Sequence, residues 1–106
     1  MGFQVGAALL DACVLSMLQK EDTYGYVLTQ TLKEILGISE STLYPVLRRL
    51  QRDEYLTTYD QPWQGRNRRY YAITEKGKEQ AEEYRKEWKI YKSNIDKLLC
   101  GDGLSE

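Results

Sequence analysis

ISESTLYPVLRRLQRD, residues 38–53, has the spacing of a helix with one apolar face. At about 3.6 residues per turn its apolar residues share one face, while its polar and basic residues occupy the others. Gly37 comes directly before it, after a second amphipathic run from Tyr24 to Leu36. Two helices joined by so short a turn predict a helix-turn-helix. The apolar face of residues 38–53 consists of Leu43, Val46, Leu47 and Leu50.

The segment after these two helices has the composition of a β-hairpin. Residues 56–60 and 66–73 are rich in β-branched and aromatic side chains, and residues 61–65 between them contain Pro62 and Gly65. A helix-turn-helix followed by a basic hairpin predicts a winged helix, whose usual partner is double-stranded DNA.

The distribution of charge supports this partner better than the total charge does. The chain has a net charge of −1, which by itself does not favour DNA binding. Six of the seven arginines, however, lie between positions 48 and 69, on the helix predicted at residues 38–53 and on the hairpin. Such a local basic surface attracts phosphates within a Debye length of about 10 Å, even on an acidic body.

The exposed side chains of this basic surface are the candidate DNA contacts. Thr42 and Tyr44 can bond phosphates or base edges, and an arginine such as Arg48 can read guanine with two hydrogen bonds. Arg66 at the hairpin tip would reach a phosphate or the minor groove. For Arg49, as for Arg52, the alternative is an ion pair with Asp53, Glu54 or the last helix. The predicted DNA-binding residues are Ser41, Thr42, Tyr44, Arg48, Arg49, Arg66 and Arg68.

Two further helices are predicted to flank this unit. Residues 5–18 form an apolar first helix, and Thr74 is expected to cap a last helix that ends near residue 100. Apolar residues of the last helix recur at alternating intervals of three and four, which is a heptad seam. A seam of this length rarely holds two chains together by itself. We therefore expect the first helix to pack with the last helix at the interface of a homodimer. The predicted interface residues are Leu10, Val14, Tyr84, Trp88, Tyr91, Ile95 and Leu98.

Three local features carry expectations of their own. Asp22 or Thr23 is expected to cap the second helix. Pro45 lies beyond the first turn of its helix and is expected to loosen the start of that helix. Gly25, early in a helix, suggests that a neighbouring group approaches closely there.

Length and composition indicate one domain. The predicted elements give it the α+β class, mostly α. They divide it into a winged helix-turn-helix unit at 5–73, a dimerisation helix at 74–100 and a flexible tail at 101–106. No apolar run approaches the roughly 20 residues of a membrane span, so we expect a cytoplasmic protein. Histidine is absent and the two cysteines are far apart, so no metal or cofactor is expected. With no nucleophile-base pair and no phosphate-binding glycine loop, an enzyme is not expected.

Several motifs together resemble one family. From about residue 8 to residue 80 the chain resembles the PadR family of bacterial transcriptional regulators, although Ser41 stands where the family often has glycine, and Glu54-Tyr55 where it often has Gly-Leu or Gly-Ile. The motifs that carry the resemblance are Tyr24-Gly25-Tyr26, Ser41-Thr42-Leu43-Tyr44-Pro45, Leu47-Arg48-Arg49-Leu50, Arg68-Arg69-Tyr70-Tyr71 and Ile73-Thr74-Glu75-Lys76-Gly77.

The resemblance implies a dimeric winged-helix repressor that binds a pseudo-palindromic operator. The form with a single carboxyl-terminal helix is similar to the multidrug-binding repressors of that family, in which a tryptophan on the last helix and its symmetry mate form a flat drug pocket at the dimer centre. Trp88 is the residue at the matching position. It can serve as dimer core or as a platform for a small hydrophobic or aromatic ligand, since two aromatic faces can stack a planar molecule between them.

Two rival functions are open besides the repressor. A winged helix used only for protein contact predicts an apolar or acidic face on residues 38–53, whereas this face carries arginines. A dimer that mainly sequesters a hydrophobic cation or planar drug, with DNA binding secondary, would share the same sequence features.

Overall fold

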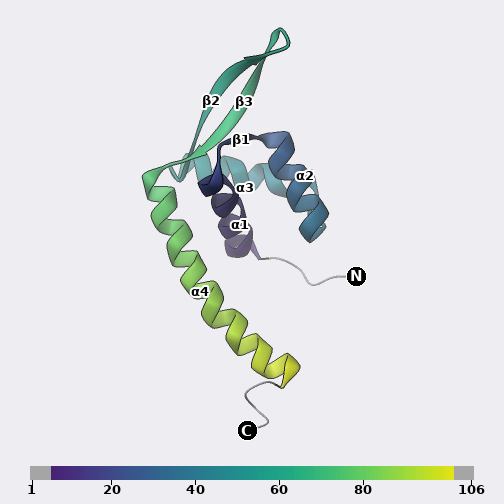
Figure 1. Cartoon of the computed structure of the whole chain (residues 1–106), viewed down its shortest axis with the longest axis vertical. Helices are drawn as coiled ribbons and strands as arrows, with labels where there is room; N and C mark the ends of the chain where they lie inside the picture. The colour runs from purple at the N-terminus through teal and green to yellow at the C-terminus, as the bar shows by residue number, and fades with distance from the viewer. Residues whose placement is uncertain (1–5, 102–106) are drawn as a thin grey trace.

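The computed structural model describes residues 6–101, and within that range it has four helices and one three-stranded antiparallel sheet (Figure 1). This arrangement confirms the α+β, mostly helical class and the winged helix-turn-helix. The hairpin projects from one end of a helical body and the long last helix from the other, over 62 Å. The elements are α1 (Ala7–Lys20), β1 (Thr23–Tyr24), α2 (Gly25–Leu36), α3 (Glu40–Arg52), β2 (Leu56–Trp63), β3 (Arg66–Ile73) and α4 (Glu75–Cys100).

The core lies between α1, α2 and α3. The predicted apolar face of α3 is confirmed, because all four of its residues are buried. Burying each such side chain stabilises the fold by about 1.5–3 kcal/mol, which orients α3 and leaves its other faces in solvent. The core residues contributed by the first two helices are Leu10, Val14, Leu15, Leu18, Leu28 and Leu32.

The position of α1 revises one expectation. Leu10 and Val14 were expected at a dimer interface, but they are 3% and 0% exposed within a single chain. The apolar surface of α1 is rich because it contacts both α3 and α4 of its own chain, so these two side chains have almost no surface left for a partner. Residue 5, the expected start of this helix, lies outside the described range, and the helix extends to Lys20.

The turn between α2 and α3 depends on Gly37. Its φ of 70° is left-handed, which costs glycine little, and its N–H donates to the Lys33 carbonyl at 2.9 Å to close α2. Ser39 then directly precedes α3, and its carbonyl accepts from two N–H groups of the first turn. The loosening expected at Pro45 does not break the helix: α3 runs unbroken through this residue, with Leu43 before it and Val46 after it buried.

The start of α2 also differs from the expectation. Neither Asp22 nor Thr23 caps this helix; its first flanking residue is Tyr24, without a side-chain cap. Instead Thr23 and Tyr24 form β1, which pairs with Tyr71 and Tyr70 of β3. Two residues are too short for any periodic signal, so this strand exists only because β3 offers a free edge.

The hairpin turn is tighter than the sequence suggested. β2 continues to Trp63, which pairs with Arg66, so the turn is Gln64-Gly65 rather than residues 61–65. Both turn residues have left-handed φ, of 49° and 77°, as a two-residue hairpin turn requires. Pro62 is compatible with the strand because β2 is at the edge of the sheet, in the order β1-β3-β2.

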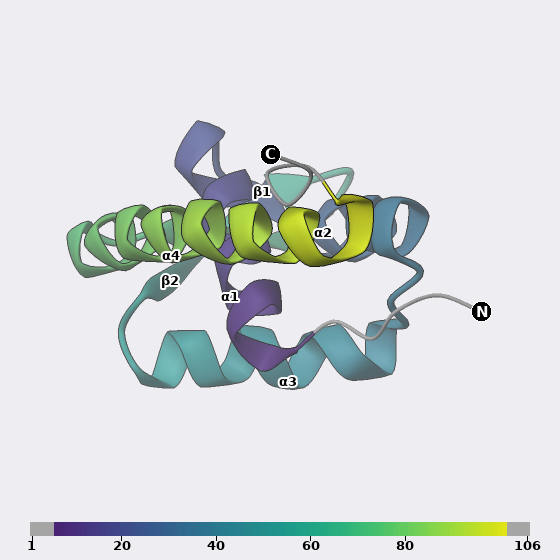
Figure 2. The same cartoon turned by 90° about the horizontal axis from the view of Figure 1, so that it is seen from below.

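The last helix begins as predicted. Thr74 caps α4, accepting the Gly77 N–H at 2.9 Å. The first half of α4 packs on α1, with Ala81 fully buried, and the second half extends past the body (Figure 1). Seen from below, α1 lies between α4 and α3 (Figure 2). Gly101 ends the helix with left-handed φ; residues 102–106 of the expected tail lie outside the described range. Among residues 6–101, no helix is long and apolar enough to cross a bilayer.

Candidate nucleic-acid interface

The amino-terminal turn of α3 presents a cluster of hydroxyl groups. The Ser39 hydroxyl lies 3.0 Å from that of Ser41 and 3.1 Å from that of Thr42, and all three residues are exposed. N–H groups at the start of a helix lack partners within the helix, and the helix dipole is positive at this end. The predicted residues Ser41 and Thr42 therefore lie where a phosphate oxygen can be bound.

Tyr44 and Arg48, which are one turn apart, are exposed on the same side of α3. Tyr44 lies beside Gly25: a Cβ on this glycine would be 3.7 Å from the Tyr44 ring and 3.6 Å from the Tyr71 ring. The neighbours inferred from Gly25 are thus present, at ordinary packing distance. A ring from α3, the recognition helix of the helix-turn-helix, and a ring from β3 therefore both lie beside Gly25, near the base of the hairpin.

The charged groups near Tyr71 identify the face of β3 that lies toward α3. Burial raises the pKa of the Tyr71 hydroxyl, and the positive charges of Arg69 and Arg48 oppose this shift. Residues two apart in a strand share a face, so Arg69 and Tyr71 lie on the side of β3 that faces Arg48. Arg69 is 64% exposed and has Asp60 at 3.7 Å.

Arg49 differs from the other predicted contacts. Its guanidinium donates to both carboxylate oxygens of Asp11 in α1, from Nη1 at 2.9 Å and from Nη2 at 2.6 Å. These hydrogen bonds raise the pKa of Arg49 further above its ordinary value. Tyr84 of α4 also donates to Asp11, at 3.4 Å. Arg49 thus follows the ion-pair alternative, with a partner that local spacing did not identify.

Arg66 and Arg68 lie on the hairpin, which we call the wing. Arg66 is exposed at the tip, opposite Trp63, as expected. Arg68 is half-buried, with its Cζ 3.6 Å from the centroid of the Trp63 ring and 3.9 Å from that of Tyr24. Arg68 and Arg69 therefore project from opposite faces of β3, although they are neighbours in the sequence.

Sequence reasoning missed three residues that shape this region: Asp11, Trp63 and Arg69. An acidic residue in an apolar helix was a signal that Asp11 would meet a cation. Strand alternation was a signal that only one of Arg68 and Arg69 could face α3. No local signal placed Trp63 against Arg68, because the length of β2 depended on the position of the turn.

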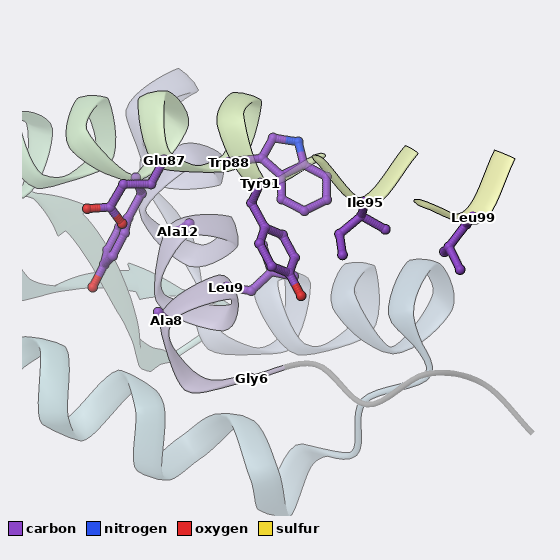
Figure 3. A pocket seen from close by; sticks show the side chains of 10 residues that line it. Gly6, Ala8, Leu9, Ala12, Glu87, Trp88, Tyr91, Ile95 and Leu99 are labelled. Carbon is purple, nitrogen blue, oxygen red and sulfur yellow. The ribbon is translucent and has the colours of Figure 1, made fainter. Parts of the chain in front are cut away.

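A second candidate site is an open apolar groove of about 870 Å³ between α1 and the second half of α4 (Figure 3). Trp88 and Tyr91 line it with ring centroids 6.3 Å apart, and Glu87 is the one charged residue among the described residues of the lining. Tyr84 borders the groove; burial, followed by the negative charge of Asp11, raises the pKa of its hydroxyl. The groove is lined by Gly6, Ala8, Leu9, Ala12, Tyr84, Glu87, Trp88, Tyr91, Ile95 and Leu99.

The predicted interface residues on α4 are divided by this arrangement. Tyr84 is half-buried against α1, whereas Trp88, Tyr91 and Leu98 are 41%, 60% and 72% exposed. Ile95 lies between them as part of the groove. Three large apolar side chains on one projecting half-helix form an exposed apolar surface, and exposing such a surface to water is unfavourable. This half of α4 is therefore suited to contact with a partner protein.

Comparison with known proteins agrees with this geometry. The structure superimposes with a TM-score of 0.87 on a crystal structure from Streptococcus mutans UA159, which is 44% identical over 95% of each chain. A PadR-like transcriptional regulator from Bacillus cereus ATCC 14579 gives a TM-score of 0.78 at 33% identity, covering 85% of this chain and 90% of that one. An uncharacterised protein of Lysinibacillus sphaericus is 35% identical over 97 residues, 87% of this chain and 89% of the relative.

A PadR family transcription regulator from Clostridium difficile R20291 gives a TM-score of 0.77 at 29% identity, covering 85% of this chain and 97% of that one. The model of the PadR-like family of transcriptional regulators matches residues 14–83, which include α2, α3, the wing and the start of α4. The chain, with its exposed hydroxyl and arginine face on α3 and its basic wing, belongs to the PadR-like family of transcriptional regulators.

Proposed function

We propose that this protein is a transcriptional repressor that binds a specific duplex as a homodimer in the cytoplasm and has no catalytic activity. The observation that carries the proposal is the composition of one surface. The exposed face of α3 presents hydroxyl groups at its start and Arg48 about two turns later, while its opposite face is buried in the core. A helix anchored in this way can enter a major groove without losing its packing.

The roles within this surface follow from residue chemistry. Ser41 and Thr42 bind a phosphate at the start of α3, and Tyr44 bonds a phosphate or a base edge. Arg48 reads a guanine with two hydrogen bonds, because its planar guanidinium matches the two acceptors of that base. Arg66 at the wing tip reaches the adjacent minor groove or its phosphates.

The second half of α4 forms the dimer contact in this proposal. Trp88, Tyr91 and Leu98 are exposed in the single chain, and a second copy related by a two-fold axis covers them with the same side chains. A two-fold dimer presents two recognition helices to one face of DNA. The half-sites of the operator are then about 34 Å apart, or a multiple of that distance.

The groove beside Trp88 is the proposed effector site. Two aromatic rings in a groove whose one charged lining residue, within the described range, is the acidic Glu87 suit a planar or hydrophobic molecule with a positive charge. Such a ligand relieves repression only to the extent that it binds the released dimer more tightly than the DNA-bound dimer.

The experiment that tests DNA binding is a fluorescence anisotropy titration. A labelled duplex from immediately upstream of the gene is compared with a scrambled duplex of equal length, at several salt concentrations. We expect tight, salt-sensitive binding that prefers the native duplex, and loss of that preference in Arg48→Ala. Lys86→Ala, which removes an equal charge from an exposed site on α4, is the control and keeps the preference.

Equal, weak binding of both duplexes, unchanged by Arg48→Ala, would contradict recognition of this duplex through α3. The effector site is tested separately by fluorescence in a Trp63→Phe background, where Trp88 is the remaining tryptophan. Quenching by a planar aromatic cation, abolished in Tyr91→Ala, is the expected result. Binding of that cation without any change in DNA affinity would favour a sequestering dimer over a ligand-released repressor.

A further inference from the structure

Arg68 connects the tip of the wing to the body of the domain. Its guanidinium lies between two rings, 3.6 Å from the Trp63 centroid and 3.9 Å from the Tyr24 centroid. Trp63 is the last residue of β2, next to the hairpin turn, whereas Tyr24 directly precedes α2, the first helix of the helix-turn-helix. One side chain therefore contacts both the far end of the wing and the unit that positions α3.

Neighbouring aromatic residues extend this contact along the same face of the sheet. Tyr70 stacks on Tyr59 with centroids 5.5 Å apart and planes 13° apart, and it meets the edge of Tyr24 at 5.6 Å. The Tyr59 hydroxyl donates to Asp22, in the segment before β1, at 2.7 Å. The wing is thus joined to the body through side chains of β2 and of β3.

The wing has few other restraints. β1 pairs only with Tyr70 and Tyr71, so residues 60–69 form a two-stranded ribbon without a third strand. In β2 and β3, Leu56 is the one fully buried residue. A two-stranded hairpin without a buried face is marginally stable in water and twists freely. Its direction relative to α3 therefore depends on side-chain contacts with the body.

The opposite face of β3 is the one that looks toward the recognition helix. Arg69 shares this face with Tyr71, whose ring lies beside Gly25 together with the ring of Tyr44 from α3. Its partner Asp60 is 3.7 Å away and half exposed, and a surface pair of this kind is weak enough for a phosphate to displace.

From these positions we propose that Tyr24, Arg68 and Trp63 form a clamp that holds the wing at a fixed angle to α3, and that Arg69 is the wing strand's phosphate contact. Arg68 is then a positioning residue, in contrast to its sequence-based prediction as a DNA contact. The proposal rests on DNA binding as the function. Its chemistry is a planar guanidinium within 4 Å of the centroids of two aromatic rings, an arrangement that lysine, with a compact ammonium group, does not reproduce.

Adjacent arginines provide a matched pair of variants. Arg68→Gln and Arg69→Gln remove the same charge from neighbouring positions of one strand, and Trp63→Ala disrupts the clamp without changing any charge. The first measurement needs no DNA: residue-level hydrogen exchange of the backbone amides of residues 60–69. We expect faster exchange in Arg68→Gln and Trp63→Ala, and exchange at the native rate in Arg69→Gln.

The second measurement is the dependence of DNA affinity on salt. Loss of one phosphate contact lowers the slope of log K against log salt by about 0.9. We expect this change in Arg69→Gln. In Arg68→Gln and Trp63→Ala we expect affinity to fall about tenfold with a nearly unchanged slope, because ordering a loosened wing has a cost that salt does not screen.

Three outcomes would overturn the proposal. A slope lowered in Arg68→Gln and unchanged in Trp63→Ala would make Arg68 a phosphate contact. Native exchange rates in Arg68→Gln and Trp63→Ala would show that no clamp exists, whether or not DNA binds. Absence of salt-dependent binding by the native protein would remove the role of Arg69 together with the proposed function, and hydrogen exchange would still decide the clamp.

Discussion

Asp11 of α1 and Arg49 of α3 form a bidentate ion pair, with two hydrogen bonds whose N–O distances are 2.9 and 2.6 Å. The carboxylate is 7% exposed and the guanidinium 35%. Since Tyr84 of α4 donates to the same carboxylate, one acidic side chain joins α3 to the helix that borders the groove beside Trp88.

Replacement of Asp11 by asparagine should destabilise the protein. Arg49 would lose its charged partner, and the N–H donors of the new amide would face those of the guanidinium. The free energy of unfolding should fall by about 1–2 kcal/mol. This is less than for a fully buried ion pair, because Arg49 is partly solvated. The free energy of unfolding is measured by urea denaturation. Glu82→Gln, which breaks an exposed pair with Arg85, is the control and should change nothing measurable. An equal effect of both variants would show that the Asp11 pair contributes nothing specific.

Gly77 in the first turn of α4 should not tolerate a side chain. A Cβ there would overlap the Tyr55 carbonyl oxygen and lie 2.7 Å from Cγ1 of Ile73, so Gly77→Ala should cost about 1–3 kcal/mol in the same assay. Gly25→Ala is the matched control. Its Cβ meets neighbours at 3.6–3.7 Å, and the loss of chain entropy in the unfolded state gives between no change and a gain of about 0.5 kcal/mol. Equal destabilisation by both would contradict the close approach at Gly77.

Thr74 should contribute stability through its hydroxyl group. The hydroxyl accepts the Gly77 N–H at 2.9 Å and donates to the Glu54 carbonyl at 2.8 Å, which joins α4 to the start of the wing. Thr74→Ala should lower the thermal midpoint, corresponding to about 1 kcal/mol, whereas Thr74→Ser, which keeps the hydroxyl, should recover most of the loss. If serine were no better than alanine, the methyl group rather than the cap would carry the effect.

Tyr84 should make the protein less stable at alkaline pH. Its folded-state pKa is raised, first by burial and then by the charge of Asp11, so the unfolded chain releases this proton at a lower pH than the folded chain. The stability that Tyr84 contributes is therefore present below about pH 10 and is lost as pH rises through the raised pKa. Denaturation midpoints between about pH 8 and about pH 11 should fall less steeply in Tyr84→Phe. Parallel curves for the two proteins would contradict a raised pKa.

Leu98 should matter for association and not for the fold of one chain, because it is 72% exposed. Leu98→Glu places a charge on the proposed dimer surface and should shift sedimentation toward the monomer, with an unchanged circular dichroism spectrum. Ser93→Glu adds the same charge on the opposite side of α4 and is the control. A monomeric native protein, or dissociation by both variants, would contradict a dimer formed through this surface.

Much of the fold follows from short-range patterns. The apolar spacing of α3, the glycine before it, the Thr74 cap and the clustering of arginines are all visible in the sequence, because helix faces, turns and caps depend on residues only a few positions apart. The helix-turn-helix, the wing and the last helix could therefore be predicted, together with the exposed residues Thr42, Tyr44 and Arg48.

Tertiary structure decided what each charged side chain meets. Arg49 binds Asp11, 38 positions away, and Arg68 lies between Tyr24 and Trp63, two residues that come together only when β1 and β2 pair on either side of β3. It also placed Leu10 and Val14 in the core of their own chain. The physical reason is that such contacts depend on strand register and helix packing, which bring distant segments together and leave no trace in local periodicity.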